Sequence, residues 1–233
     1  VMLHSIIVHT AQQFPGLFPT VKINYPKRER KEMRVLSRNE QEQFVSFLLD
    51  ETDQCKFGVL LMLLSGVRIG ELCALKWENV DLKERTMRVS STLQRLRNTE
   101  ADNEKRTRIV VSTPKSETSM RTIPLTDHVI RLCERFADKN TSAFILTGTE
   151  DYMEPRVLQY RIEKYTKECG LDGVHAHTLR HTFATRAVEV GFEIKSLSEI
   201  LGHSNTTITL ERYVHSSMEL KRSNMDKLTA VGL

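Results

Sequence analysis

The sequence predicts a mainly helical domain with a small antiparallel β-sheet, an α+β fold. Apolar residues recur at helical spacing over most of the chain, whereas the section between about residues 79 and 125 contains short strand-like segments instead. Residues that start and stop helices flank several of the helical stretches. With 233 residues, the chain is long enough to bury one full-sized core and to carry an appendage.

The main domain opens with a well-marked helix start. Ser37 is a typical N-cap residue, and Glu40 follows at the position that completes a capping box. Phe44, Phe47 and Leu48 then give this helix one apolar face. We therefore expect the first helix of the domain to begin at Ser37 and to pack on the core through that face.

The next stretch, residues 55–65, is almost entirely apolar, which is typical of a helix at the centre of a core. The pair Ser65-Gly66 ends this helix. A third helix is expected over about residues 70–77. Arg68 therefore lies at a break between two apolar helices, which is an unusual setting for a charged residue.

The middle of the chain differs in kind from its flanks. Residues 79–81 are expected to form a turn, and the polar stretch 94–107 a mobile loop. Residues 112–120, which contain Lys115, are expected at the tip of a hairpin. Short strands are predicted at 87–89, 108–111 and 121–125.

Helices resume after the predicted strands. A stripe of apolar residues at helical spacing runs through 177–190, and Gly202 is a typical stop residue for the short helix before it. Ser216 and Glu219 form a second capping box near the end of the chain. The expected helices cover about residues 127–137, 156–169, 177–190, 194–201, 204–213 and 216–228.

Composition divides the chain into four parts: residues 1–20, with an apolar patch and a turn; a basic linker, 21–35; the main domain, 36–215; and a C-terminal helix and tail, 216–233. A flexible basic strap suits contacts with a phosphate backbone, although composition alone fits a solvated linker equally well. The linker cations that we expect to contact DNA are Lys27, Arg28, Arg30 and Lys31.

Composition also narrows the class of protein. The formal net charge is +4, which is weak support for a nucleic-acid partner. The apolar runs are too short to span a bilayer, and no leader with a cleavage site opens the sequence, so we expect no membrane partner. Four scattered cysteines without a C-x-x-C spacing favour a reducing, cytoplasmic setting over disulfides.

Two arginines carry the first hint of chemistry. Arg68 follows the helix break, and Arg180 lies three residues after His177, so both members of this second pair share one helix face. An arginine fork can hold two non-bridging phosphate oxygens through charge-assisted hydrogen bonds. Taken singly, either arginine fits a surface ion pair as well.

Five motifs follow one another along the chain, and their order is more informative than any one of them. They are Ser65-Gly66-Val67-Arg68-Ile69-Gly70-Glu71-Leu72; Thr113-Pro114-Lys115-Ser116 with Arg121-Thr122-Ile123-Pro124-Leu125; His177-Thr178-Leu179-Arg180-His181-Thr182-Phe183-Ala184-Thr185; Leu201-Gly202-His203-Ser204; and Tyr213-Val214-His215. The series closely resembles the catalytic domain of tyrosine recombinases, especially the integrases of phages and conjugative transposons. The resemblance covers about residues 33–215.

The resemblance implies a role for each matching residue. Tyr213 would be the nucleophile, a phenol with an ordinary pKa of about 10 that needs a positive field or a base. Arg68 and Arg180 would clamp the scissile phosphate and neutralise charge in the transition state. Lys115 would be the general acid that protonates the departing 5′ hydroxyl.

The remaining matches would support this centre. His177 would exchange a proton near the nucleophile, and His203 would donate a hydrogen bond to the phosphate. Glu71 would orient the cationic site, and His181 would have a structural or supporting part. Arg121 is expected to contact DNA together with the linker cations.

The resemblance further implies the tyrosine recombinase catalytic-domain fold and a reaction at double-stranded DNA recombination sites. Four copies would assemble on two sites, with accessory DNA-bending or directionality proteins, in a bacterial or phage setting at the nucleoid. Strands would be cleaved through a 3′-phosphotyrosine and rejoined, without ATP, metal or another cofactor, to integrate and excise a mobile element. Residues 1–20 would be the tail of a truncated core-binding domain, and residues 216–233 would be exchanged between subunits.

Three other readings compete. A metal phosphoesterase could use His175, His177, His181 and His203, but acidic residues are not grouped with them, and the cations would repel a metal ion. A type IB topoisomerase shares the same chemistry and differs in assembly. A non-catalytic DNA-binding module would need only the short helices 194–201 and 204–213, and it would not need the six residues Arg68, Lys115, His177, Arg180, His203 and Tyr213.

Overall fold

The computed structural model describes residues 2–14, 33–98, 107–112, 119–137, 140–213 and 225–226. The chain divides into two units, residues 1–32 and 33–233. The described part of the first unit is helix α1 (Met2–Gln13), which leaves Ile6 and Val8 exposed. None of the helices in the described ranges is long and apolar enough to cross a membrane.

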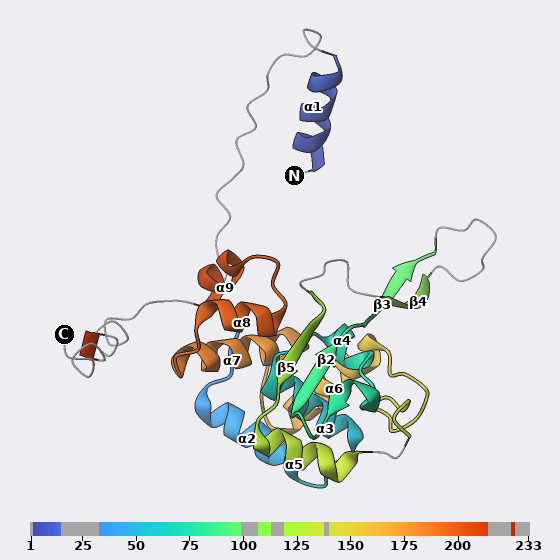
Figure 1. Ribbon diagram of the computed structural model, residues 1–233, viewed down its shortest axis with the longest axis vertical. Coiled ribbons are helices and arrows are strands. Elements are labelled where there is room, and N and C mark those ends of the chain that lie inside the picture. Colours follow the sequence, from blue (N-terminus) through green and yellow to red (C-terminus); the bar gives the residue numbers. More distant parts are fainter. Residues whose placement is uncertain are drawn as a thin grey trace. The chain divides into compact units, whose positions relative to one another are not determined.

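The second unit is mostly helical with small antiparallel sheets, which confirms the predicted fold class (Figure 1). Its helices match the expected ones closely between residues 127 and 213. They are α2 (Arg38–Leu49), α3 (Gln54–Ser65), α4 (Ile69–Cys73), the 3₁₀ turn η1 (Trp77–Asn79), α5 (Asp127–Phe136), α6 (Pro155–Glu168), α7 (Ala176–Glu189), α8 (Ile194–Leu201) and α9 (Thr206–Tyr213).

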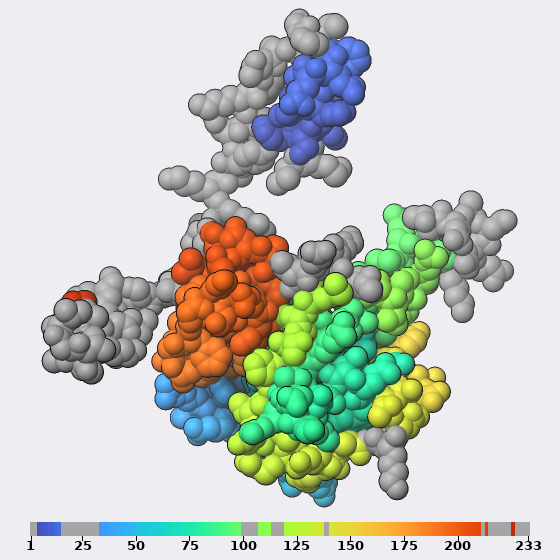
Figure 2. All heavy atoms as spheres, in the orientation of Figure 1, coloured from blue at the N-terminus to red at the C-terminus, as the bar shows by residue number. Residues whose placement is uncertain are grey.

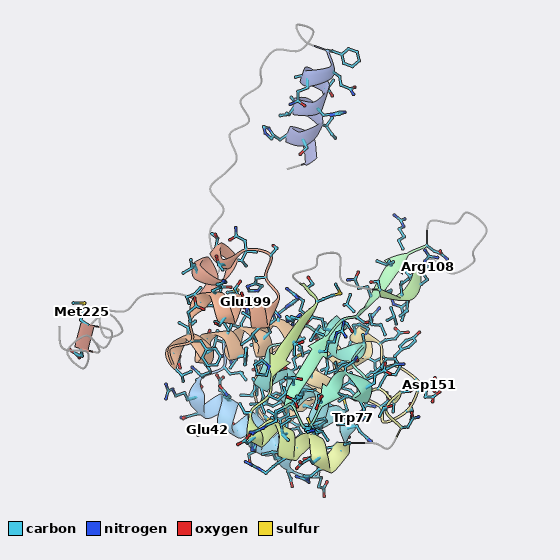
Figure 3. The ribbon with its side chains drawn as sticks, in the orientation of Figure 1. Glu42, Trp77, Arg108, Asp151, Glu199 and Met225 are labelled. Carbon is cyan, nitrogen blue, oxygen red and sulfur yellow. The ribbon has the colours of Figure 1, made fainter. Side chains whose placement is uncertain are left out.

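Helix α3 is the centre of the core, as its apolar sequence predicted. Nine of its twelve residues are buried, and burying each large apolar side chain contributes about 1.5–3 kcal/mol. Phe57 stacks on Trp77 with ring centroids 5.9 Å apart, and Figure 3 shows Trp77 among the crowded side chains of the interior. Because α3 also packs against α7, the core fixes the helix that carries the third motif.

Local signals set the helix ends. Both hydrogen bonds of the predicted capping box are present, from Glu40 N to Ser37 Oγ (3.3 Å) and from Ser37 N to Glu40 Oε2 (2.8 Å). Gly66 and Gly202 end α3 and α8 in the left-handed conformation, with φ of 68° and 63°. Residues with a side chain rarely adopt this backbone conformation, so glycine is favoured at both positions.

The strands form two separate sheets. Strand β2 (Thr86–Val89) pairs antiparallel with both β1 (Val80–Asp81) and β5 (Arg121–Pro124), with Met87 opposite Ile123. Strands β3 (Thr92–Arg97) and β4 (Thr107–Ser112) pair with each other in a hairpin. Figure 3 labels Arg108 on this hairpin, where its side chain is exposed.

Three sequence expectations in this region were wrong. Residues 79–81 were expected to form a turn, but Val80 and Asp81 form strand β1 because they pair with Met87 and Thr86. The stretch 94–107 was expected to be a mobile loop, but residues 94–97 belong to β3 because their backbone groups pair with β4. The helix expected over 70–77 ends at Cys73, because the chain beyond it pairs elsewhere: Ile145 N donates to Leu75 O, and Trp77 N donates to Ala143 O. The expected C-terminal helix, 216–228, lies outside the described residues except for 225–226.

Helices α7, α8 and α9 form one layer beside the first sheet. Helix α8 contacts α7, α9 and β5, and Figure 2 shows the atoms of α7–α9 as one block next to those of β5. This packing brings the end of α3, the start of α4, β5 and the α8–α9 turn into one neighbourhood. The described residues of the five motifs belong to these elements and to α7 and α9, whereas the Lys115 segment and residues 214–215 lie outside the described residues.

Candidate active site

One open pocket collects side chains from distant parts of the sequence. Its volume is about 630 Å³. The α3–α4 break, α7, the α8–α9 turn and α9 all contribute to its wall. The lining residues are Met33, Arg68, His177, Arg180, His181, His203 and Ile208.

Arg68 is fixed by the residue that follows it by one helical turn. Its Nη1 donates to Glu71 Oε1 (2.7 Å), its backbone N donates to Glu71 Oε2 (2.8 Å), and its Nη2 donates to Gly202 O (2.7 Å). The side chain remains 35% exposed. Arg68 can therefore face a ligand in the pocket while Glu71 and the Gly202 carbonyl fix the orientation of its guanidinium.

Arg121 is the second partner of Glu71. Its Nη1 and Nη2 donate to the two carboxylate oxygens (3.0 and 2.8 Å), and its Nε donates to Ile200 O (2.5 Å). Both side chains are buried, at 6% exposed for Arg121 and 4% for Glu71. Burial alone would raise the pKa of the Glu71 carboxyl, but Arg121 and Arg68 together lower this pKa below its usual value.

The burial of Arg121 argues against the contact with DNA that the sequence suggested. Its guanidinium is committed to Glu71 and to backbone carbonyls inside the protein, so it does not line the pocket. The same contacts join β5 to α4 and α8. Arg121 is therefore a residue that holds the site together.

Arg180 is the most deeply buried cation of the pocket wall, at 4% exposed. Its Nη1 donates to Gly66 O and its Nη2 to Leu201 O, both at 2.7 Å. Burial lowers the pKa of this guanidinium, the charge of Arg68 acts in the same direction, and Glu71 opposes it. The site thus holds positive charge under repulsion, and an anion in the pocket would relieve that repulsion.

His203 lies between Arg180 and α9. Arg180 Nη2 donates to His203 Nε2 (3.0 Å), because arginine has no acceptor, and His203 Nδ1 is 2.8 Å from Thr209 Oγ1. In the neutral ring, Nδ1 therefore carries the hydrogen and donates to Thr209. To donate from Nε2 to a phosphate, as the sequence suggested, His203 has to release Arg180 and gain a hydrogen on Nε2, either as a second proton or by a change of tautomer.

Tyr213 reaches the site from the end of α9. Its hydroxyl is 2.6 Å from His181 Nδ1, and the side chain is only 6% exposed. Its ring lies parallel to that of His203, with centroids 6.4 Å apart. The ring of His177 lies against that of His181, with centroids 6.3 Å apart. The residue expected to have a supporting part is thus in direct contact with the expected nucleophile.

The structure brings together Arg68, Glu71, His177, Arg180, His181, His203 and Tyr213. Lys115 and the linker cations Lys27, Arg28, Arg30 and Lys31 lie outside the described residues. Sequence reasoning missed Thr209, which is fully buried. A lone threonine on a short helix carries no local signal for such a contact.

The chemistry of the pocket is that of an anion site. Two guanidinium groups and three imidazoles line it, and arginine matches the geometry of phosphate oxygens. In the described ranges, His, Cys, Asp and Glu side chains form no group of three that could hold a metal ion. The arrangement can bind a phosphodiester and place a phenol beside it.

The profile of the Phage integrase family matches residues 34–219, most of the chain and every element of this site. The chain belongs to the phage integrase family. Its relatives include the transposase of transposon Tn916 from Enterococcus faecalis, 28% identical over 83% of this chain and 52% of that protein. A XerC-like tyrosine recombinase from Caldanaerobacter subterraneus is 26% identical over 72% of this chain and 47% of its own length.

Solved structures agree with this membership. The integrase of transposon Tn1549, in complex with a circular intermediate DNA, superposes with a TM-score of 0.68 at 26% identity, over 87% of this chain and 68% of that one. The XerA recombinase has the same fold, with a TM-score of 0.60. The chain thus has the tyrosine recombinase catalytic-domain fold, and it spans about half the length of the curated relatives it matches.

Proposed function

We propose that the chain is the catalytic part of a site-specific DNA integrase that serves a mobile element. One observation carries this proposal: an open cationic pocket and a tyrosine hydroxyl meet through four separate elements of the fold. A DNA-binding module would not need two arginines in one pocket beside a tyrosine. Family membership and the transposon relatives support the same function.

In the proposed reaction, the phosphodiester enters the pocket and its non-bridging oxygens accept hydrogen bonds from Arg68 and Arg180. Charge that develops on these oxygens in the transition state is stabilised by groups already in place, which typically contributes 10²–10³-fold per donor. Glu71 and Arg121 hold Arg68 in its direction. His203 would add a donor once it has released Arg180 and carries a hydrogen on Nε2.

Tyr213 Oη would attack phosphorus while the bond to the 5′ oxygen breaks. The products would be a 3′-phosphotyrosine and a free 5′ hydroxyl, with Lys115 as the proposed source of the leaving proton. The hydroxyl of a partner strand would then attack the same phosphorus and release Tyr213. One phosphoester replaces another at each step, so the reaction needs no ATP.

The assembly belongs to the proposal as well. Two strands of two DNA sites have to be exchanged, so four copies of the protein would act together on DNA, with accessory proteins setting the direction. Residues 21–35 would contact the DNA backbone, and residues 216–233 would pack on a neighbouring copy. Deleting residues 217–233 should then weaken assembly more than DNA binding, as measured by native gel shifts.

Denaturing electrophoresis tests the proposal. The protein is mixed with a nicked suicide duplex carrying the joined ends of the element that encodes it, on which a cleaved strand cannot be religated. We expect a covalent protein–DNA band with the wild type and a loss of at least about 10⁴-fold with Tyr213→Phe. DNA binding without any adduct would favour a non-catalytic module instead.

A further inference from the structure

The contact between His181 and Tyr213 raises the question of where the phenolic proton goes. Tyr213 Oη and His181 Nδ1 are 2.6 Å apart, within the range in which a positioned base takes a proton directly. His181 is half-buried and lines the pocket together with Arg68 and Arg180. His181 and the two arginines expected to hold the phosphate therefore line the same pocket.

We propose that His181 is the catalytic base for Tyr213, an inference that rests on the proposed function. As Tyr213 Oη forms its bond to phosphorus, the phenolic proton passes to His181 Nδ1 and the bond to the 5′ oxygen breaks. In the rejoining step the 5′ hydroxyl of the partner strand forms its bond to phosphorus, the bond between Tyr213 Oη and phosphorus breaks, and His181 returns the proton to Tyr213 Oη. The leaving 5′ oxygen takes its proton from the proposed acid Lys115, and no oxidant or reductant takes part.

The energetics fit a transfer that is concerted with attack. An ordinary phenol has a pKa of about 10 and an ordinary imidazole about 6.5, so the proton stays on the oxygen at rest. Bonding to phosphorus removes the basicity of that oxygen, and the transfer then runs downhill. The neighbouring cations Arg68 and Arg180 stabilise the charge that builds up on the phosphate in the same step.

Position on helix α7 explains how one short segment serves both tasks. Arg180 and His181 are consecutive, so their side chains leave the helix about 100° apart. Arg180 turns inward to the carbonyls of Gly66 and Leu201, while His181 turns toward α9. His177 lies one turn earlier with its ring against that of His181, where it supports the base and lines the pocket.

The variant His181→Asn separates holding the phenol from taking its proton. Asparagine places an acceptor oxygen near the position of Nδ1, but it cannot accept the proton. We expect this variant to bind DNA as the wild type does and to form the covalent adduct about 10²-fold more slowly on the suicide duplex. His181→Leu removes both functions and serves as the second variant, with circular dichroism to check that each protein folds.

Replacing Tyr213 by a fluorinated tyrosine gives the decisive comparison. Fluorine makes the phenol more acidic, so attack depends less on a base. The defect of His181→Asn should then shrink to within about 10-fold of the matching His181 protein, whereas the defect of Arg180→Lys should keep its size.

Two results would overturn the assignment of the base. One is an adduct rate in His181→Asn equal to that of the wild type. The other is a defect of equal size with tyrosine and with fluorotyrosine, which would mean that His181 only holds the ring. The proposed function fails separately, if the wild type forms no adduct or if Tyr213→Phe still forms one.

Discussion

The phosphate clamp and the nucleophile helix are built in different ways. The clamp, formed by Arg68, Glu71, Arg121 and Arg180, ties α4, α7 and β5 together through charged hydrogen bonds, most of them buried. Helix α9 instead contacts two histidines beside the clamp. Tyr213 shares a hydrogen bond with His181, and Thr209 shares one with His203.

The two regions thus have different tasks: the clamp stabilises charge on the phosphate, and helix α9 positions the nucleophile. Groups that stabilise a transition state act best when they are fixed before the substrate arrives, and the clamp is fixed by the fold itself. A typical hydrogen bond contributes only about 1 kcal/mol, so α9 can exchange its contacts as DNA binds. Changes in the clamp should damage both stability and chemistry, and changes in α9 mainly chemistry.

The largest effect is expected from Arg180→Lys. Lysine keeps the charge but cannot bond to the carbonyls of Gly66 and Leu201 and to a phosphate with one fixed fork. We expect the single-turnover rate of adduct formation to fall by about 10³-fold. Arg186→Lys, on the same helix but outside the pocket, should stay within about 3-fold of the wild type, and equal rates in the two variants would contradict a special role of Arg180.

The variant Glu71→Gln tests the clamp as a structural unit. It leaves the buried guanidinium of Arg121 without its counter-charge, which should lower the free energy of unfolding by about 3 kcal/mol or more. The matched control is Glu40→Gln, because its pair with Arg34 is partly exposed and glutamine still completes a capping box. Urea denaturation should show a change below about 1 kcal/mol for the control, and similar losses in both variants would disprove the distinction.

The stability difference between the wild type and Glu71→Gln should depend on pH. The pKa of Glu71 is lowered in the folded protein, so its stabilising effect is fully present above the ordinary value of about 4.3 and is lost as the pH falls through the folded value. The difference in unfolding free energy between wild type and Glu71→Gln should therefore shrink as the pH is lowered from 5 through the folded pKa of Glu71. A difference that stays constant over this range would show that the carboxylate is not stabilised by its cations.

The smallest effect is expected in α9. Thr209→Val keeps the shape but removes the oxygen that accepts from His203 Nδ1. We expect a loss of about 1 kcal/mol in unfolding free energy and about 10-fold in adduct formation. Thr207→Val, an exposed change on the same helix, provides the control; a cost above about 3 kcal/mol for Thr209→Val would mean that α9 is as firmly built in as the clamp.

Features set by neighbouring residues could be predicted from the sequence. The Ser37 capping box and the stop at Gly202 depend on interactions within a few positions, and both are confirmed. Strand β3 was missed because its polar residues show no alternation, and its pairing with β4 across the chain decides its structure. The fold class followed from periodicity, and the outcome confirms it.

The site was only partly accessible in this way. The order of the motifs revealed a resemblance to a family, and that resemblance identified residues that meet in the pocket. The long-range partners of those residues could not be found, since Glu71 and Arg121 are 50 positions apart and His181 and Tyr213 are 32 apart. The motif therefore predicted correctly that Arg121 belongs to the site, but not that its side chain is buried against Glu71.

Mass spectrometry of the trapped protein–DNA adduct tests the central claim most directly. After nuclease and protease digestion, the phosphorylated peptide should carry its modification on Tyr213, joined to the 3′ end of the cleaved strand. The clamp should be needed for its formation, so Arg180→Lys should give the same peptide at much lower yield. A linkage at another residue, or to a 5′ phosphate, would contradict the claim that this pocket activates Tyr213.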